Sequence, residues 1–302
     1  MKCLIVGCGY VGLPLGAELV RLGHEVSGLR RTEAAAAELK AAGIVPLVAD
    51  ITQPETLAKL PRGFDWVVNC VAAGGGADNY RQIYLQGTRN LVEWLAPDPP
   101  KKFVYTSSTS VYGQTDGSQV KESSPTEPLV DTAKVLVEAE QVLLAAAREK
   151  KFPAVILRVA GIYGPDRGHW FKQYLKNEAR LEGDGSRYLN MIHREDVIGC
   201  IVAALKSGRP GEVYNAVDDE PVTQMNFFQW LAGTVGKYPP PSEPENVEEN
   251  RKRGVTNKRV SNRRLKMELG YQFKYPNFRK GYSAEILRLE RAGQLHIEPD
   301  ER

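Results

Sequence analysis

Cysteine is scarce in this chain, with four among 302 residues. They are Cys3, Cys8, Cys70 and Cys200. Their spacing suits neither a zinc site nor a disulfide framework, so no bound metal is expected. Because each cysteine lies within an apolar segment, we expect buried free thiols and a cytoplasmic protein.

The sequence also lacks long apolar runs and a large excess of charge. No segment approaches the roughly 18 consecutive apolar residues that a membrane-spanning helix needs. The first residues carry one lysine followed by glycines and a proline, which predicts a strand and a turn rather than a signal peptide. The 40 basic and 37 acidic side chains leave a net charge of +3. We therefore expect a small-molecule substrate, without nucleic acid or membrane as a partner.

Three glycines follow the first apolar segment. Residues 1–6 predict a buried parallel strand, and residues 13–22 predict a helix. Gly7, Gly9 and Gly12 between them form the pattern G-x-G-x-x-G. Between a strand and a helix this pattern predicts dinucleotide binding, because Gly9 lets backbone N–H groups approach a pyrophosphate and Gly12 lets the helix pack closely. A glycine-rich turn without a ligand is the alternative. The expected cofactor contacts are Gly7, Gly9, Tyr10, Val11 and Gly12.

Two arginines end the second predicted strand, which covers residues 25–29. NAD-binding proteins place an Asp or Glu about 20 residues after the glycines, on the ribose 2′-hydroxyl. Here Arg30 and Arg31 stand at that position, and guanidinium groups suit a 2′-phosphate through charge-assisted hydrogen bonds. We therefore expect NADP rather than NAD, held by Arg30 and Arg31. A solvated pair of charges is the alternative.

Further cofactor contacts are expected after the next two strands. The third predicted strand, residues 45–49, is followed by Asp50 and Ile51, which are placed to flank an adenine. A cap or turn role for Asp50 fits the spacing equally well. The fourth strand, residues 65–71, leads into Ala72, where a small side chain lets the backbone lie close to a cofactor.

Strands and helices alternate over the first half of the chain. This alternation predicts an α/β fold with a doubly wound parallel sheet of Rossmann type and a small C-terminal substrate domain. We expect an NAD(P)-binding domain over residues 1–165, to which a segment at about 190–220 returns. The substrate-binding part is expected mainly over residues 166–302. Long helices are predicted over residues 79–95 and 129–150.

Hydroxyl side chains cluster after the fifth predicted strand, in Ser107-Ser108-Thr109-Ser110-Val111-Tyr112-Gly113. Open α/β sheets bind ligands at the carboxyl ends of their strands. Together with Leu157-Arg158, Tyr163-Gly164-Pro165 and Gly211-Glu212-Val213-Tyr214-Asn215, this cluster resembles the landmarks of extended short-chain dehydrogenases/reductases. That family includes the nucleotide-sugar epimerases and dehydratases. The glycine pattern resembles its atypical branch, and the resemblance implies a Rossmann fold and an NAD(P)-dependent enzyme.

The catalytic residues that this resemblance implies are only partly present. The family carries Tyr-x-x-x-Lys on the helix after its serine-containing strand end. Aligning the lysine with Lys134 places Val130 at the tyrosine, and Tyr84 stands where the family has asparagine. The resemblance then implies that Ser108 orients the substrate oxygen and that Lys134 holds the nicotinamide ribose. A solvated lysine paired with Glu138, four residues later, is the alternative for Lys134. Valine can transfer no proton.

Other side chains are candidates for the missing proton transfer. By position the candidates are Thr109, Tyr112, Tyr163 and His193. Three of these are expected to contact the substrate: Thr109, Tyr112 and His193. A packed aromatic ring is the alternative for each tyrosine, and a structural role beside Asp196 is the alternative for His193. We expect an NADP-dependent oxidoreductase or epimerase-like enzyme acting on a small polar or nucleotide-sugar-like substrate. The alternative is a non-catalytic NADP-binding sensor or regulatory protein.

Three further features concern partners. Residues 7–16 also resemble the opening of UDP-sugar 6-dehydrogenases, but these use a downstream cysteine, and Cys200 lies in an apolar helix. The basic stretch 251–264 could bind a phosphorylated substrate, with a solvated loop as the alternative. The family resemblance implies a homodimer through the helices over 79–95 and 129–150.

Overall fold

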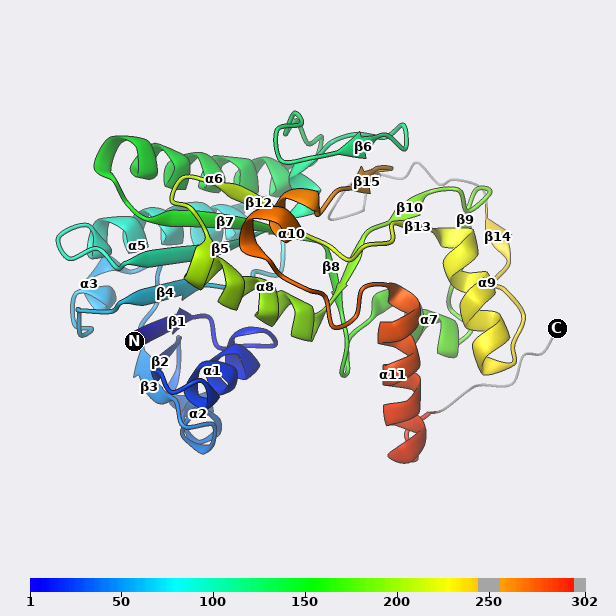
Figure 1. Ribbon diagram of the computed structural model, residues 1–302, viewed down its shortest axis with the longest axis horizontal. Helices are drawn as coiled ribbons and strands as arrows, with labels where there is room; N and C mark the ends of the chain where they lie inside the picture. The colour runs from blue at the N-terminus through cyan, green and yellow to red at the C-terminus, as the bar shows by residue number, and fades with distance from the viewer. Residues whose placement is uncertain (244–255, 296–302) are drawn as a thin grey trace.

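The computed structural model describes residues 1–243 and 256–295. Over these residues the chain forms a larger half, in which a twisted sheet lies between helices, and a smaller second half (Figure 1). The second half carries α7 (His169–Leu175), α9 (Gln224–Val235) and α11 (Phe278–Arg291). Among the described residues, no helix is long and apolar enough to cross a membrane.

Parallel strands form the sheet of the larger half, and seven are found in the described part of the chain. In spatial order they are β12 (Val213–Ala216), β7 (Ala154–Val159), β5 (Lys102–Ser108), β4 (Trp66–Asn69), β1 (Lys2–Val6), β2 (Glu25–Arg30) and β3 (Val45–Val48). The chain order reverses between β1 and β4, where Val6 pairs with Leu29 on one side and with Asn69 on the other. Doubly wound sheets bind ligands at such a switch point. The predicted doubly wound Rossmann fold is confirmed.

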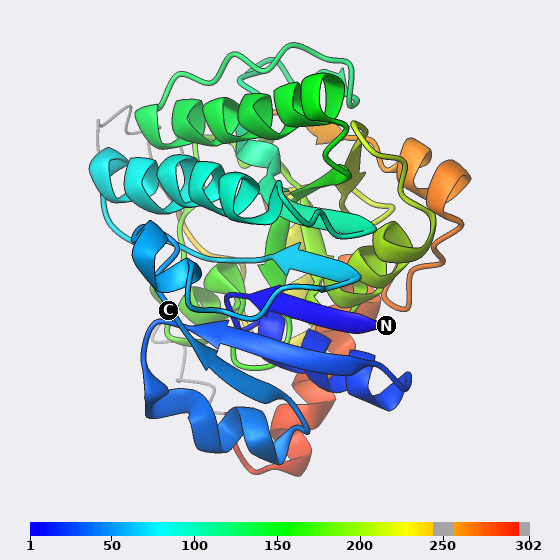
Figure 2. The same cartoon turned by 90° about the vertical axis from the view of Figure 1, so that its left-hand side faces the viewer.

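Helices cover both faces of this sheet. One face packs against α1 (Gly12–Arg21), α2 (Ala36–Ala41) and α8 (Arg194–Ser207), and the other against α3 (Pro54–Leu57), α5 (Gly87–Leu95) and α6 (Asp131–Lys150). Figure 2 shows α5 and α6 lying side by side on their face of the sheet. The helix predicted over residues 79–95 consists of α4 (Ala77–Tyr80), a π-helical segment (Arg81–Gln86) and α5.

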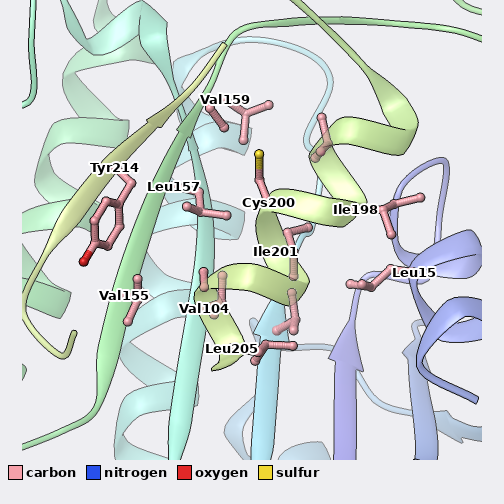
Figure 3. Packing of buried hydrophobic residues seen from close by; sticks show 14 of the residues in the cluster. Leu15, Val104, Val155, Leu157, Val159, Ile198, Cys200, Ile201, Leu205 and Tyr214 are labelled. Carbon is pink, nitrogen blue, oxygen red and sulfur yellow. The ribbon is translucent and has the colours of Figure 1, made fainter. Parts of the chain in front are cut away.

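Side-chain alternation along β7 explains why both faces are covered. Val155 and Leu157 belong to the apolar cluster under α8, whereas Ile156 belongs to the cluster under α5 and α6. Successive strand residues point to opposite faces, so the apolar run from Ala154 to Leu157 must be buried on both faces of the sheet. In Figure 3, Cys200 and Ile201 of α8 point toward the sheet side chains.

The second half is built from short strand pairs around an aromatic core. The pairs are β8 (Gly161–Tyr163) with β11 (Met191–His193), β10 (Tyr188–Leu189) with β13 (Val222–Thr223), and β9 (Leu181–Glu182) with β14 (Ser242–Glu243). β15 (Arg259–Val260) pairs with β6 (Gln119–Val120) of the larger half and is followed by α10 (Arg263–Leu269). The late chain thereby returns to the carboxyl edge of the main sheet.

The second half departs most from the local sequence patterns. A single strand is predicted over residues 188–192, but Asn190 separates β10 from β11. The Asn190 amide donates to the Lys258 carbonyl at 2.8 Å and accepts from the Val260 N–H at 2.8 Å. This side chain therefore joins distant segments instead of continuing a strand. The local pattern also predicts a helix over residues 167–179, of which the structure forms only α7, whereas α9 and α11 were not predicted.

Candidate functional site

The glycine turn after β1 has one open glycine and two enclosed ones. Gly7 has a φ of +94°, and a Cβ at Gly12 would overlap the Gly7 carbonyl oxygen. At Gly9 the nearest atom to an added Cβ is Nη1 of Arg30, at 4.0 Å. Gly12 therefore lets α1 pack on the turn without itself lining the cleft, which corrects the expected direct contact. Gly9 leaves the backbone accessible to a ligand.

A cleft of about 1540 Å³ begins at this turn and extends into the second half. Most of the predicted site residues line it: Gly7, Gly9, Tyr10, Val11, Arg30, Arg31, Asp50, Ile51, Ala72, Ser108 and Thr109. Gly12, Tyr112, Lys134 and His193 are not among the lining residues. The carboxyl ends of β1, β2, β3, β4 and β5 thus converge on one cavity.

The charged end of the cleft lies beside the open glycine. The Arg30 guanidinium donates a hydrogen bond to the Cys8 carbonyl, and Arg31 is exposed at the cleft. Asp50 accepts hydrogen bonds from the N–H and the hydroxyl of Thr52, at 2.9 and 2.8 Å. Asp50 is therefore a turn residue that also lines the cleft, and its contact with an adenine stays a prediction.

Tyr10 connects the glycine turn to the second half. Its hydroxyl donates to the Pro165 carbonyl at 2.9 Å. The guanidinium carbons of Arg167 and Arg194 lie 5.0 and 4.9 Å from its ring centroid, within the range of cation–π contacts. Burial raises the pKa of Tyr10 above its usual value, with the two arginines opposing that effect. The phenol therefore stays protonated at neutral pH and donates its hydrogen bond.

The hydroxyl cluster after β5 occupies the inner part of the cleft. Ser108 Oγ accepts a hydrogen bond from the Ser110 N–H at 3.1 Å and caps the short turn Thr109–Val111. A small hollow continues from this point toward α6. Its lining residues are Tyr80, Tyr84, Thr106, Ser107, Ser108, Ser110, Thr132 and Leu136.

The lining of this hollow corrects the alignment of α6. Thr132 and Leu136 line it, and residues four apart lie on one helix face. Lys134 has a side chain that is 54% exposed and forms an ion pair with Asp131 at 2.9 Å. Val130 precedes α6 and has an extended backbone. The positions that face Ser108 across the hollow are therefore Thr132 and Leu136, and the role expected for Lys134 is not supported by its placement.

Tyr112 belongs to a buried polar network and not to the cleft. Its hydroxyl donates to Oδ1 of Asn215 at 2.8 Å and accepts from Nη1 of Arg158 at 2.8 Å. Arg158 in turn forms a buried ion pair with Glu140, 2.7 Å between Nη2 and Oε2. Removing one partner of a buried ion pair typically costs about 3–5 kcal/mol, so this network stabilises the fold beneath the site. The packed-aromatic alternative holds for Tyr112.

His193 is also structural. Its Nδ1 accepts a hydrogen bond from the Glu195 N–H at 3.2 Å, which caps α8. Its ring lies 3.9 Å from that of Tyr275, and burial lowers the pKa of His193 to about 4. The neutral imidazole is needed for this cap, which corrects the expected substrate contact. Tyr163 stacks on Tyr282 at 4.3 Å in the aromatic core, and it also lines the cleft.

Two tyrosines that the sequence analysis did not place at the site line the same hollow as Ser108. Tyr80 and Tyr84 flank the start of the π-helical segment, and their rings lie 4.9 Å apart. The Tyr84 oxygen accepts a hydrogen bond from the Ala73 N–H at 3.1 Å. π-helical turns in α-helices are frequent at functional sites. The sequence signal was Tyr84 itself, at the position where the family has asparagine.

A buried lysine on the opposite wall was also missed. Lys258 is 4% exposed and lines the cleft, although it lies in the basic stretch 251–264. Arg264 of that stretch forms ion pairs with Glu212 and Glu268, at 2.5 and 3.0 Å. The stretch is therefore not simply a solvated loop where the structure describes it. Its first residues, Arg251, Lys252 and Arg253, lie outside the described residues.

The family model described as "NAD dependent epimerase/dehydratase family" matches residues 3–216 of this chain. The chain belongs to this family. The match includes the glycine turn, the strand-end hydroxyls and the buried Arg158 network. The resemblance noted in the sequence is therefore confirmed.

Relatives of similar length extend the match beyond residue 216. Protein YeeZ of Escherichia coli (strain K12) is 28% identical over 286 residues, covering 91% of this chain and 97% of YeeZ. A conserved protein from Silicibacter pomeroyi, described as functionally unknown, has a TM-score of 0.78 at 29% identity, covering 96% of this chain and 98% of that one. The dTDP-glucose 4,6-dehydratase DesIV from Streptomyces venezuelae, solved with NAD bound, has a TM-score of 0.82 at 23% identity, covering 96% and 97%. The DesIV comparison supports the fold alone.

Proposed function

We propose that this protein is an NADP-dependent oxidoreductase or epimerase-like enzyme of the atypical extended short-chain type. The observation that carries the proposal is the single cleft, which joins the open glycine turn, the Arg30–Arg31 pair and the Ser108 strand end to a polar second half. A small polar or nucleotide-sugar-like substrate fits a cavity lined by Arg167, Arg187 and Asn190. A hydride-transfer enzyme must hold its cofactor and its substrate next to each other, and a cleft with a cofactor side and a substrate side allows this.

The residues at the switch point suit a dinucleotide. Gly9 offers backbone close to a pyrophosphate, at the start of α1, whose positive dipole end faces the same place. Asp50 and Ile51 would flank the adenine of a bound cofactor, and the small Ala72 would let its nicotinamide half lie close to the backbone. The bound cofactor would supply the hydride acceptor or donor.

The residues at the strand end suit binding and protonation of a substrate oxygen. Ser108 already accepts one hydrogen bond from Ser110, so its own O–H remains to orient a hydroxyl or carbonyl of the substrate. Tyr84 supplies a phenol in the same hollow, where the family's usual tyrosine position is Thr132. We infer that Tyr84 assists proton transfer, because its phenol lines the same hollow as Ser108 and is held there by the Ala73 N–H at 3.1 Å.

The direct test is turnover. Purified protein with NADPH or NADP should be screened against sugar nucleotides and simple carbonyl or hydroxyl compounds, with cofactor absorbance as the measurement. Ser108→Ala should lower kcat by roughly 10²-fold, because a positioned hydrogen-bonding group is lost at the reacting oxygen. Lys134→Ala is the matched control and should leave turnover within about twofold. Equal turnover in Ser108→Ala and the parent would contradict the proposed site.

Cofactor preference follows from the Arg30–Arg31 pair. NADPH should bind roughly ten- to a hundredfold more tightly than NADH, because a charge-assisted hydrogen bond contributes about 1.5–3 kcal/mol. Arg30→Ala or Arg31→Ala should remove most of that difference and leave NADH binding nearly unchanged. Fluorescence titration of each variant with both dinucleotides measures it. Equal affinities in the parent would contradict a contact between these arginines and a 2′-phosphate.

A second candidate function has an observation of its own. Thr132 and Leu136 stand at the helix positions that face Ser108, and neither can replace the acid–base pair of the family. The absence of a tyrosine and a lysine at these two helix positions favours a non-catalytic NADP-binding sensor or regulatory protein. NADPH binding without turnover in the full screen would favour this alternative. Cytoplasmic location and a homodimer through α5 and α6 remain predictions.

A further inference from the structure

Lys258 presents a buried cation to the substrate side of the cleft. Its ammonium group donates to the Tyr112 carbonyl at 2.7 Å and to Thr256 Oγ1 at 2.9 Å. An ammonium group has three N–H donors, and the third has no partner among the residues that the structure describes. Both Lys258 and Thr256 line the cleft. A buried donor that opens onto a cavity is suited to an incoming acceptor.

The backbone around Lys258 holds this side chain in one place. Asn190 bonds the Lys258 carbonyl, and the Arg259 N–H donates to the Ser118 carbonyl at 2.9 Å. One residue earlier, the Asn257 side chain accepts from the Tyr188 N–H at 3.0 Å. These bonds join the larger half to the second half on both sides of Lys258. The ammonium group is therefore preorganised, which lowers the entropy lost when a ligand binds.

The carboxylates of the network around Tyr112, Glu122 and Glu140, have partners other than Lys258. Glu122 Oε1 accepts from the Asn215 N–H at 2.9 Å. Glu140 lies beneath Tyr112, but its carboxylate is occupied by Arg158 and by the Ser107 hydroxyl at 2.6 Å. The Tyr112 phenol is bonded to Arg158, and burial raises its pKa, so it stays neutral.

The second-half side chains bonded to the segment around Lys258 are neutral or basic, whereas the acidic Asp166, Glu178 and Glu182 also line the cleft but form no ion pair with Lys258 among the described residues. Tyr188 lies next to Asn257 and stacks with the Arg259 guanidinium at 5.5 Å. Asn190 and Thr256 are uncharged. Burial alone lowers the pKa of Lys258 to about 8, and no ion pair with Lys258 is found in the described part of the chain. A buried cation of this kind is costly unless an anion completes it.

We propose that Lys258 binds an anionic oxygen group of the substrate, a carboxylate or a phosphate, at the end of the cleft opposite the Arg30–Arg31 pair. This inference rests on the proposed function, because it assigns the substrate class of the same cleft. The proposal makes Lys258 a specificity-determining residue. The Tyr112 carbonyl, 146 positions earlier in the chain, holds the Lys258 ammonium group in place. The substrate would then be held at its oxygen by Ser108 and at its anion by Lys258.

The binding should depend on pH in a direction that Lys258 sets. Below pH 8 the free lysine is protonated and ready for an anion. Above pH 8 the free lysine is largely neutral and must take up a proton when an anion binds. The affinity for the anion should therefore fall as the pH rises. From pH 7.5 to 9.5 the expected loss is up to about 20-fold, provided that the bound anion keeps the lysine protonated. Lys258→Arg should show no such fall, because arginine stays charged over this range.

The test uses sulfate and acetate as probes, because neither titrates between pH 7.5 and 9.5. Each is titrated calorimetrically into full-length protein, with and without saturating NADPH, at ionic strength held constant with sodium chloride. Sulfate represents a phosphate and acetate a carboxylate, so the tighter of the two identifies the group. Lys258→Met should weaken the preferred anion at least about tenfold. Lys172→Met, which removes another cleft lysine, is the matched control and should not.

Each outcome decides the proposal. Loss of anion binding in Lys258→Met but not in Lys172→Met supports it. Equal binding in Lys258→Met and the parent, or no binding of either anion to the parent, overturns it. If Lys258→Met does not fold, the pH profiles of the parent and Lys258→Arg decide: a fall in the parent alone supports the proposal, and identical profiles overturn it. Failure of NADPH to bind, measured by thermal shift, would count against the proposed function and not against the anion site.

Discussion

Gly9→Val should abolish dinucleotide binding and leave the fold intact. A Cβ added at Gly9 meets no atom within 4 Å except Arg30 Nη1 at 4.0 Å, at the far end of a flexible side chain, so we expect the free protein to accept the substitution. A valine would occupy the space through which a pyrophosphate reaches the backbone. At a hundredfold excess over Kd, NADPH should stabilise the parent by about 2.7 kcal/mol and the variant not at all. Thermal unfolding with and without NADPH measures both quantities.

Gly12→Ala is the informative contrast. A Cβ at Gly12 would overlap the Gly7 carbonyl oxygen, so this variant should be less stable than the parent before any cofactor is added. Gly9→Val should match the parent in that condition. If Gly9→Val gains the same thermal shift from NADPH as the parent, the phosphates do not bind at this turn.

Restoring the family's pair at the corrected positions should create or raise reductase activity. In Thr132→Tyr/Leu136→Lys the phenol and the ammonium group would both face the hollow beside Ser108. The resemblance implies an acid–base role for the tyrosine and a ribose-holding role for the lysine. A positioned acid contributes roughly 10²–10⁴-fold, so NADPH oxidation with simple carbonyls should rise by that order. Cofactor absorbance with a panel of aldehydes and ketones is the measurement.

Val130→Tyr serves as the control for this design. Val130 precedes α6 with an extended backbone, so a tyrosine there does not share a helix face with the hollow. It should therefore give no gain. Because Leu136 is 5% exposed, the double variant needs a thermal-unfolding check and an NADPH titration before its activity is judged. A folded, NADPH-binding double variant without any rise in activity would show that the hollow is not the reaction site.

The cofactor half of the site could be predicted because its signals are local. The glycine turn follows β1, Arg30 and Arg31 stand at the end of β2, and Ala72 comes shortly after β4, so each signal lies at the carboxyl end of a predicted strand. The carboxyl ends of parallel strands meet at one edge, so residues that follow such strands gather there without further information. Gly9, Arg30 and Ala72 all line the cleft as a result.

The substrate half could not be predicted in the same way. On a helix, successive residues are about 100° apart, so the two-residue error in aligning α6 rotated the expected lysine by about 200°, away from the hollow and into solvent. Nothing in the spacing of Lys134 and Glu138 reveals this error. The buried Glu140–Arg158 pair fixes the true orientation, and that pair joins α6 to a strand that follows it in the chain.

The sequence by itself determined the doubly wound sheet, the dinucleotide turn and the family, because periodicity and turn chemistry act between near neighbours in the chain. Only the tertiary structure decided that Tyr112 and His193 are structural, since burial depends on what packs from elsewhere. It also brought Lys258 onto Tyr112 across 146 positions, through β15 and Asn190. The physical reason is that a side chain's charge state and access to ligand are set by desolvation and long-range contacts, which no local pattern encodes.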